Sequence, residues 1–179
     1  MNNNTFVHKY IRSLIKKTDT VVDMTAGNGN DTLFLSELAG EVLAFDISPE
    51  AIRRSKEKLK DADNVQFIND NHIHLDRYLK KKIRLFLFNL GYLPNSDETR
   101  ITKAKETLIA FKKAYDFLED RGYIVITFYI GHKGGKEEYY LLKDYIEEKR
   151  LHICETYRQY KIDAPITYII RKDQFNTSL

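Results

Sequence analysis

The chain has few of the residues that staple or stiffen a protein. Among its 179 residues there are one cysteine, three prolines, eight glycines and no tryptophan. A lone cysteine, Cys154, excludes an internal disulfide, and so little proline and glycine excludes a low-complexity or collagen-like chain. The first residues contain no small-residue cleavage site after an apolar core. We therefore expect a cytoplasmic protein.

Long hydrophobic runs and a strong charge of one sign are also missing. The most apolar stretches, residues 85–90 and 123–130, are far shorter than the roughly 20 residues that span a bilayer, so no membrane segment is expected. There are 29 basic and 26 acidic residues, for a net charge of +3, which permits binding to nucleic acid without requiring it. The 42% of hydrophobic residues supply the material for one core.

Apolar runs alternate with segments of helical period over the first two thirds of the chain. Runs rich in branched or aromatic residues at 20–24, 42–45, 65–69, 84–90 and 123–129 predict strands. Apolar residues recur at steps of three and four between the strands, most clearly over 101–118, and further helices are expected over 6–16 and 137–148. Two extended segments, 151–160 and 166–171, predict an antiparallel hairpin.

This order predicts a single α/β domain over residues 1–179. An N-terminal helix lies within residues 1–18, βα units cover 19–150 and the terminal hairpin covers 151–179. The expected architecture is Rossmann-like: a doubly wound, mostly parallel, seven-stranded sheet with a C-terminal antiparallel hairpin. Ligands of such sheets bind at the carboxyl ends of the strands. The loops that follow the strands are therefore expected to carry the chemistry.

The loop after the first strand combines glycines with acids. Gly27 and Gly29 let the backbone pass close to a ligand, directly before a helix. The dinucleotide-binding motif has a third glycine at the position where this chain has Thr32. The carboxylates of Asp23 and Asp31 would each oppose a pyrophosphate by about 1 to 4 kcal/mol. The loop therefore suits a cationic ligand such as S-adenosylmethionine, whose amine Asp23 can face directly or through water.

Two further strand ends carry polar residues. Asp46 follows the second strand, where an acid can accept both hydroxyls of a ribose. The alternative is that Asp46 caps the helix that begins at Pro49, a position for which Ser48 is already suited. Asp70 and Asn71 follow the third strand. They either accept a hydrogen bond from an adenine amino group or form a plain polar turn.

The ends of the fourth and fifth strands carry the candidate catalytic residues. The side-chain oxygen of Asn89 can accept an N–H of an amine substrate, and Tyr92 can stack on a planar base for about 1 to 3 kcal/mol. His132 follows the fifth strand and can accept or relay a proton near neutral pH. The alternative is that these segments are an ordinary turn and a solvated loop.

The remaining histidines and lysines carry weaker signals. His72 and His74 stand two residues apart, which on a strand places both on one face, but no further ligands accompany them, so no metal site is expected. His8 is interpreted as a surface histidine of the first helix. Four basic residues follow strand ends, where they can approach an RNA backbone: Arg100, Lys103, Lys133 and Lys136.

Four motifs together resemble those of class I S-adenosylmethionine-dependent methyltransferases. They are VVDMTAGNGNDTLFLSEL, EVLAFDISPEAI, LFNLGYLP and YIGHKGGKEE, in this order along almost the whole chain. Within that class they are similar to the rRNA-methylase-like group that includes the MnmM-type tRNA methyltransferases. The resemblance implies S-adenosylmethionine as cofactor and the anticodon region of tRNA as partner. The implied product is 5-methylaminomethyl-2-thiouridine, formed from the wobble 5-aminomethyl-2-thiouridine.

The resemblance also implies that one methyltransferase domain holds its cofactor in the loops after the strands. The expected cofactor-binding residues, from the motifs and from their places after strand ends, are Asp23, Thr25, Gly27, Asn28, Gly29, Asn30, Asp31, Thr32, Asp46, Ile47, Asp70, Asn71, His72 and Asn89. The chain departs from the usual N-methyltransferase tetrad, which has two prolines where Leu90 and Gly91 stand here.

Other functions stay open at the level of sequence. The same fold serves nicotinamide-dependent oxidoreductases, although Thr32 and the acids of the first loop argue against one. A methyltransferase acting on rRNA or on a small amine, and an RNA-binding module without activity, are further alternatives. The tyrosine-containing terminal hairpin can also pair two copies of the chain, so a homodimer is an additional expectation.

Overall fold

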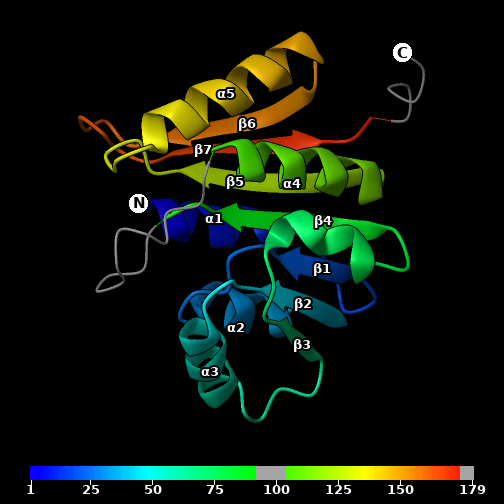
Figure 1. The fold of residues 1–179 in the computed structure, drawn as a ribbon. Coiled ribbons are helices and arrows are strands. Elements are labelled where there is room, and N and C mark those ends of the chain that lie inside the picture. Colours follow the sequence, from blue (N-terminus) through cyan, green and yellow to red (C-terminus); the bar gives the residue numbers. More distant parts are fainter. Residues whose placement is uncertain (92–103, 174–179) are drawn as a thin grey trace.

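The computed structural model describes residues 1–91 and 104–173 of the chain. In this part, seven strands form one sheet in the order β3-β2-β1-β4-β5-β7-β6, with helices on both faces (Figure 1). Strands β1 to β5 are parallel, and β7 is antiparallel to both of its neighbours, β5 and β6. This confirms the predicted architecture. The strands are β1 (Thr20–Asp23), β2 (Glu41–Phe45), β3 (Val65–Ile68), β4 (Ile83–Asn89), β5 (Leu118–Phe128), β6 (His152–Arg158) and β7 (Ile166–Arg171).

Helices connect the strands and cover the sheet. They are α1 (Asn3–Ile11), α2 (Asn30–Ser36), α3 (Pro49–Lys58), the short 3-10 helix η1 (His72–Arg77), α4 (Ala104–Phe117) and α5 (Gly135–Glu148). The start of α3 is as the sequence predicts: the Ser48 hydroxyl accepts the N–H of Ala51, and Pro49 is the first helical residue.

Several expected boundaries differ from those observed, most clearly the end of the first helix and the start of the fifth strand. Helix α1 ends at Ile11 because the chain then turns toward β1: the Ser13 hydroxyl donates to the carbonyl of Tyr10 and the Lys16 N–H donates to Asp19. Strand β5 begins at Leu118, directly after α4, because Leu118 already pairs with β4. His72 and His74 lie in the 3-10 helix η1, after β3, so the two-residue spacing does not place them on one strand face.

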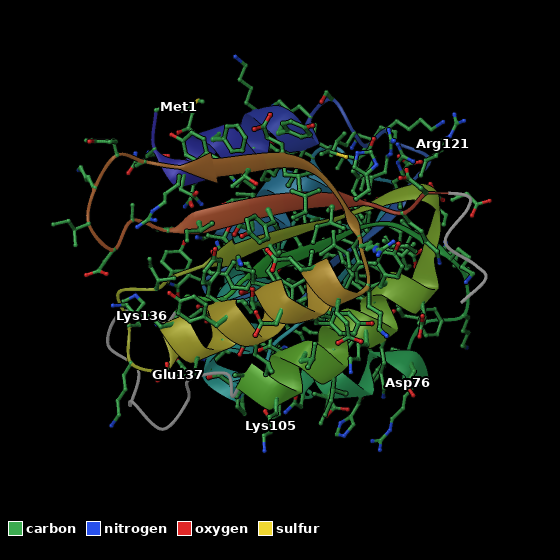
Figure 2. All side chains as sticks on the ribbon, turned by 90° about the horizontal axis from the view of Figure 1, so that it is seen from above. Met1, Asp76, Lys105, Arg121, Lys136 and Glu137 are labelled. Atoms are coloured by element: carbon green, nitrogen blue, oxygen red, sulfur yellow. The ribbon has the colours of Figure 1, made fainter. Side chains whose placement is uncertain are left out.

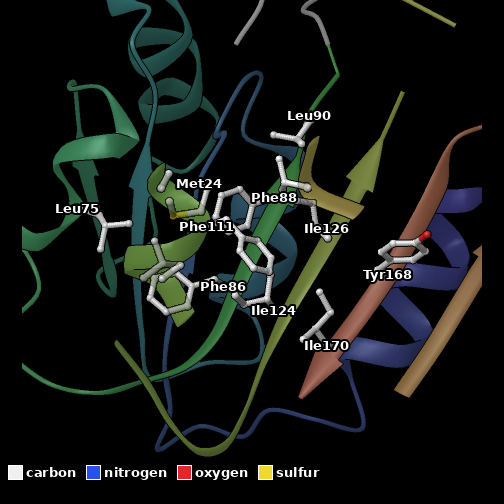
Figure 3. Packing of buried hydrophobic residues seen from close by; sticks show 14 of the residues in the cluster. Met24, Leu75, Phe86, Phe88, Leu90, Phe111, Ile124, Ile126, Tyr168 and Ile170 are labelled. Atoms are coloured by element: carbon white, nitrogen blue, oxygen red, sulfur yellow. The ribbon is translucent and has the colours of Figure 1, made fainter. Parts of the chain in front are cut away.

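Alternating side chains of the central strands build two hydrophobic layers. Val21, Leu85 and Leu87 pack with α1 and α2 on one face of the sheet. Phe86 and Phe88, one position away on β4, pack with η1, α4 and α5 on the other face (Figure 3). Each fully buried aromatic side chain contributes about 1.5 to 3 kcal/mol. The sheet that carries the strand ends is therefore fixed from both sides.

The strand directions bring five loops to one edge of the sheet. Parallel strands β1 to β5 all end there, and β7 begins there because Ile166 pairs with Phe128 at the end of β5. The turn between β6 and β7 therefore lies at the same edge, as Figure 1 shows. We call this edge the carboxyl edge. Within residues 1–91 and 104–173, no helix is long and apolar enough to cross a membrane.

Candidate functional site

The buried acid Asp23 holds the loop after β1 in place through hydrogen bonds. Asp23 is fully buried, and its two carboxylate oxygens accept the N–H of Thr25 at 3.0 Å and the hydroxyl of Thr32 at 2.6 Å. Burial, assisted by the negative charge of Asp31, raises the pKa of Asp23 to about 7. Asp23 thus lies beneath the loop and organises it, and its expected interaction with an amine, directly or through water, stays a prediction.

The two glycines of this loop have backbone angles that other residues rarely adopt. Gly27 has φ 54° and Gly29 has φ 75°. A side chain at Gly29 would also come within 3.0 Å of the Ser55 hydroxyl of α3, and that hydroxyl donates to the carbonyl of Gly27. Asn28 is half-buried between the glycines, and Asn30, the first residue of α2, accepts from Lys58. The turn is therefore closed tightly against α3.

Asp46 joins the loop after β1 to the loop after β2. One of its carboxylate oxygens accepts the N–H of Gly27 at 2.9 Å and the other accepts the N–H of Ser48 at 2.8 Å. Next to it, Ile47 is 48% exposed, which leaves an apolar surface beside the acid. The ribose contact of Asp46 and the cofactor contact of Ile47 stay predictions. Both residues follow the end of β2.

Thr25 joins the same loop to the end of β4. Its hydroxyl oxygen accepts the backbone N–H of Asn89 and its hydroxyl donates to the backbone carbonyl of Asn89, both at 3.1 Å. Hydrogen bonds therefore hold the ends of β1, β2 and β4 in fixed relation to one another.

Asp31 is the acid that reaches the surface of this loop, with a side chain 13% exposed. Its Oδ1 lies 2.8 Å from Nε2 of His8, and its Oδ2 lies 2.7 Å from Nδ2 of Asn89. The His8 ring stacks on Phe34, with ring centroids 3.8 Å apart. Three distant segments, α1, α2 and β4, thus meet at one carboxylate.

The carboxylate of Asp31 determines how the Asn89 side chain is oriented. An ionised carboxylate only accepts hydrogen bonds, so Asn89 must turn its NH₂ group toward Asp31 and its Oδ1 away. That Oδ1 is buried and has no hydrogen-bond donor among the described residues. Buried acceptors of this kind are costly unless a partner reaches them. Asn89 therefore presents a fixed, unused acceptor at the end of β4.

Tyr129 closes this part of the site from the end of β5. Burial and the charge of Asp31 raise the pKa of its hydroxyl, while a hydrogen bond with the Asn89 side chain opposes that rise. A side chain at Gly91 would lie 3.2 Å from the Tyr129 ring. Gly91, where the N-methyltransferase tetrad has proline, thus leaves room for this tyrosine.

The third strand end is occupied with its own hydrogen bonds. The carboxylate of Asp70 accepts from His74 and from the Tyr78 hydroxyl, both at 2.8 Å, and these bonds lower the pKa of Asp70. Asn71 caps η1 and donates to Glu106 of α4. This arrangement matches the polar-turn alternative, and the adenine contact of Asp70 stays a prediction.

His72 is buried behind the loop after β1. Its Nδ1 lies 3.3 Å from the carbonyl of Met24, its Nε2 is buried without a partner among the described residues, and burial lowers its pKa. A neutral His72 therefore supports the loop from the α4 side of the sheet. Within the described residues, no three His, Cys, Asp or Glu side chains gather in a group that could hold a metal ion.

The candidates after β5 lie on the exposed part of the carboxyl edge. His132, Lys133 and Lys136 are exposed, the His132 ring is 6.0 Å from the Tyr129 ring, and Lys136 lies 3.8 Å from Asp163. Three further candidates lie outside the described residues: Tyr92, Arg100 and Lys103.

Two members of this site are absent from the sequence-based list. His8 was interpreted as a surface residue, and Tyr129 was assigned only to a strand. His8 reaches Asp31 across 23 positions and Tyr129 follows the strand beside β4, so no local spacing marks either residue. The exposed end of an apolar strand is the only sequence signal that points to Tyr129.

Comparison with known proteins agrees with the geometry. The family model described as "Putative rRNA methylase" matches residues 42–171. A chloroplastic tRNA (mnm(5)s(2)U34)-methyltransferase of Arabidopsis thaliana is 36% identical over 147 residues, which cover 73% of this chain. The match spans 54%, or about half, of that relative's length.

Solved structures share the whole fold. A "putative rRNA-methylase" from Clostridium thermocellum superposes with a TM-score of 0.87 at 34% identity, covering 96% of this chain and 98% of the other. A "putative methyltransferase" from Streptococcus mutans, solved in complex with SAH, has a TM-score of 0.83 at 32% identity with the same coverage of both chains. On its sequence and on its fold alike, the chain belongs to the rRNA methylase family.

Proposed function

We propose that the protein transfers a methyl group from S-adenosylmethionine to an amine nitrogen of RNA. The proposed acceptor is the aminomethyl nitrogen of 5-aminomethyl-2-thiouridine at the wobble position of tRNA. The observation that carries the proposal is the buried, unpartnered Oδ1 of Asn89 beside the organised loop after β1. An amine offers the N–H groups that such an acceptor needs. The name of the Arabidopsis relative supports the choice of nucleoside.

The loops after β1 and β2 fit the cofactor. Gly27 and Gly29 keep side chains out of the turn, and Asp31 gives it a negative charge at the surface, which favours a sulfonium and an ammonium over a pyrophosphate. Asp46 and Ile47 stand where a ribose and an adenine would be held. When bound, S-adenosylmethionine supplies an electrophilic methyl group. The complex of the Streptococcus mutans relative with SAH supports this assignment.

Asn89 orients the substrate amine in the proposed reaction. Its Oδ1 accepts one N–H, so that the nitrogen lone pair points along the line of transfer, and positioning of this kind supplies most of the acceleration. Only a neutral amine has that lone pair, so the amine must lose a proton before the methyl group is transferred. Tyr92 and His132 stay the proposed candidates for accepting its proton.

Nucleoside mass spectrometry tests the proposal directly. Purified protein, S-adenosylmethionine and tRNA from cells that lack the protein are expected to yield 5-methylaminomethyl-2-thiouridine at the expense of its aminomethyl precursor. Ribosomal RNA and a simple alkylamine serve as alternative acceptors. Methylation of either of these instead of tRNA would reassign the substrate, and cofactor binding without methylation of any acceptor would overturn the activity. The cytoplasmic location and the homodimer stay predictions.

A further inference from the structure

The turn between β6 and β7 is a firmly held projection at the carboxyl edge. We call residues 158–163 the hairpin tip. The Gln159 side chain and the Tyr157 hydroxyl both donate to the carbonyl of Met1, and Tyr157 stacks on Phe6 of α1 with ring centroids 4.1 Å apart. Figure 2 shows Met1 and Lys136 at the same end of the molecule as this turn. The hairpin tip is thus supported by the N-terminal segment.

The hairpin tip also touches the loop after β5. A side chain at Gly131 would come within 3.3 Å of Asp163 in the tip, and Lys136 lies 3.8 Å from the Asp163 carboxylate. Gly131 is two residues after Tyr129, which borders Asn89. The hairpin tip therefore lies against the loop after β5, the loop that begins with Tyr129 next to Asn89.

Large apolar side chains at the hairpin tip are exposed between basic ones. Tyr160 is fully exposed and Ile162 is 93% exposed. Lys161 stands between them and Arg158 precedes them, both exposed. The neighbouring loop adds the exposed Lys133 and Lys136. Aromatic side chains among positive charges are the combination that binds single-stranded nucleic acid, through base stacking and phosphate contacts.

We propose that the hairpin tip is an RNA-docking surface, on which Tyr160 and Ile162 contact an unpaired base while Lys161 and Arg158 contact the phosphate backbone. This inference rests on the proposed function and names the surface that holds its substrate. Single-stranded loops of RNA offer splayed bases of this kind, whereas a paired helix hides them. The hairpin tip therefore selects a loop of RNA over a duplex.

Charge favours RNA over a second copy of the chain as the occupant of the hairpin tip. A symmetric contact in which two hairpin tips faced each other would bring Lys161 and Arg158 of one tip close to the same residues of the other. Asp163 is the single acid of the tip, and it already faces Lys136. An RNA backbone neutralises these positive charges, whereas a second copy adds to them.

Equilibrium binding of a fluorescent tRNA, measured without cofactor, tests the inference. Tyr160→Ala is expected to weaken binding by about tenfold, within the range for loss of one stacked base, and Tyr160→Phe is expected to bind like the wild type. Lys161→Ala is expected to lower the slope of affinity against salt by about 0.7 to 0.9. Matched controls are Ile109→Ser on α4 and Lys60→Ala after α3, which change exposed residues elsewhere.

The possible outcomes separate this inference from the proposed function. If the wild type methylates tRNA and the tip variants bind and methylate it with unchanged Kd and KM, the hairpin tip is not the docking surface. If tRNA binding depends on Tyr160 but no RNA is methylated, the docking surface stands and the proposed function fails. Equal loss of affinity for duplex RNA would contradict recognition of a loop. Sedimentation that showed Tyr160→Ala to dissociate a dimer would overturn the inference in favour of a contact between copies.

Discussion

The two halves of the carboxyl edge differ in how their polar side chains are used. After β1 and β2, the carboxylates of Asp23 and Asp46 each accept two hydrogen bonds from the loops themselves. After β5 and at the hairpin tip, Lys133, Lys161 and Tyr160 extend into solvent. The first half is organised before any ligand binds, and the second half presents its groups to a partner.

This difference matches what we propose that each half recognises. A small cofactor of constant shape is bound best by a site that is already formed, because no ordering cost then reduces the affinity. An RNA loop presents bases and phosphates over a larger area, and exposed aromatic and basic groups match it. Asn89 lies at the boundary between the two halves. Its Nδ2 donates to Asp31 of the organised half, whereas its Oδ1 has no partner among the described residues.

Asn89→Ala tests this boundary and is expected to have the largest effect. Loss of the acceptor that orients the amine should lower kcat by about 100-fold, comparable to loss of one transition-state hydrogen bond in other enzymes. Cofactor affinity should change by less than about threefold, because the loops after β1 and β2 stay intact. Single-turnover methylation and calorimetry with S-adenosylmethionine measure the two quantities separately.

Two results would change the role assigned to Asn89. Normal turnover by Asn89→Ala would remove this side chain from the reaction altogether. A large loss of cofactor affinity with kcat maintained at saturation would place Asn89 in the cofactor-binding half.

His8→Ala tests whether the organised half extends to α1, with a smaller expected effect. His8 acts through Asp31, so its removal should loosen the orientation of Asn89 and lower kcat by about tenfold, the equivalent of one hydrogen bond to a charged group. His8→Gln retains a donor toward Asp31 and is expected to restore most of the loss.

His152→Ala is the matched control for His8→Ala. His152 also pairs with an aspartate, Asp173, at 2.7 Å, but at the start of β6, away from the carboxyl edge. It should leave kcat unchanged. If the role of His8 is purely structural, His8→Ala should lower thermal stability, and His8→Gln should not restore kcat. In that case the hydrogen exchange of the Asn89 side-chain amide, measured by NMR, should be the same in the wild type and in all variants.

Glu138→Gln is expected to change stability and leave the chemistry unaffected. Glu138 is buried between α5 and α4, where it accepts from the Thr107 hydroxyl, and burial raises its pKa from 4.5 to about 7. The folded protein therefore keeps a proton that the unfolded chain releases between these pH values, so the stability of the wild type falls as the pH rises through this range. Glutamine carries no charge and avoids this loss.

Urea unfolding at several pH values measures this effect. The variant is expected to be more stable than the wild type by about 3 kcal/mol at pH 8, and the difference should shrink toward zero near pH 4. If the wild type and the variant were equally stable at every pH, the pKa of Glu138 would not be raised in the folded protein.

Local patterns were sufficient to predict most of the fold. Strand β7 has the predicted bounds and the cap of α3 is formed by Ser48, because strand alternation and helix capping depend on residues a few positions apart. The start of β5 was missed because the helical period of α4 continues through Leu118, whereas pairing with Ile83 places that residue in the sheet. Pairing between distant strands overrides a local period.

The sequence by itself determined the order of elements, the glycine turn after β1 and the presence of Asn89 at a strand end, since all of these are written in neighbouring residues. The tertiary structure alone decided that Asp23 lies buried beneath the loop, that His8 and Asp31 orient Asn89, and that the hairpin tip stands beside the loop after β5. These contacts join residues up to 58 positions apart in the case of Asp31 and Asn89. Only the packing of α1, α2 and the sheet brings such residues within hydrogen-bonding distance.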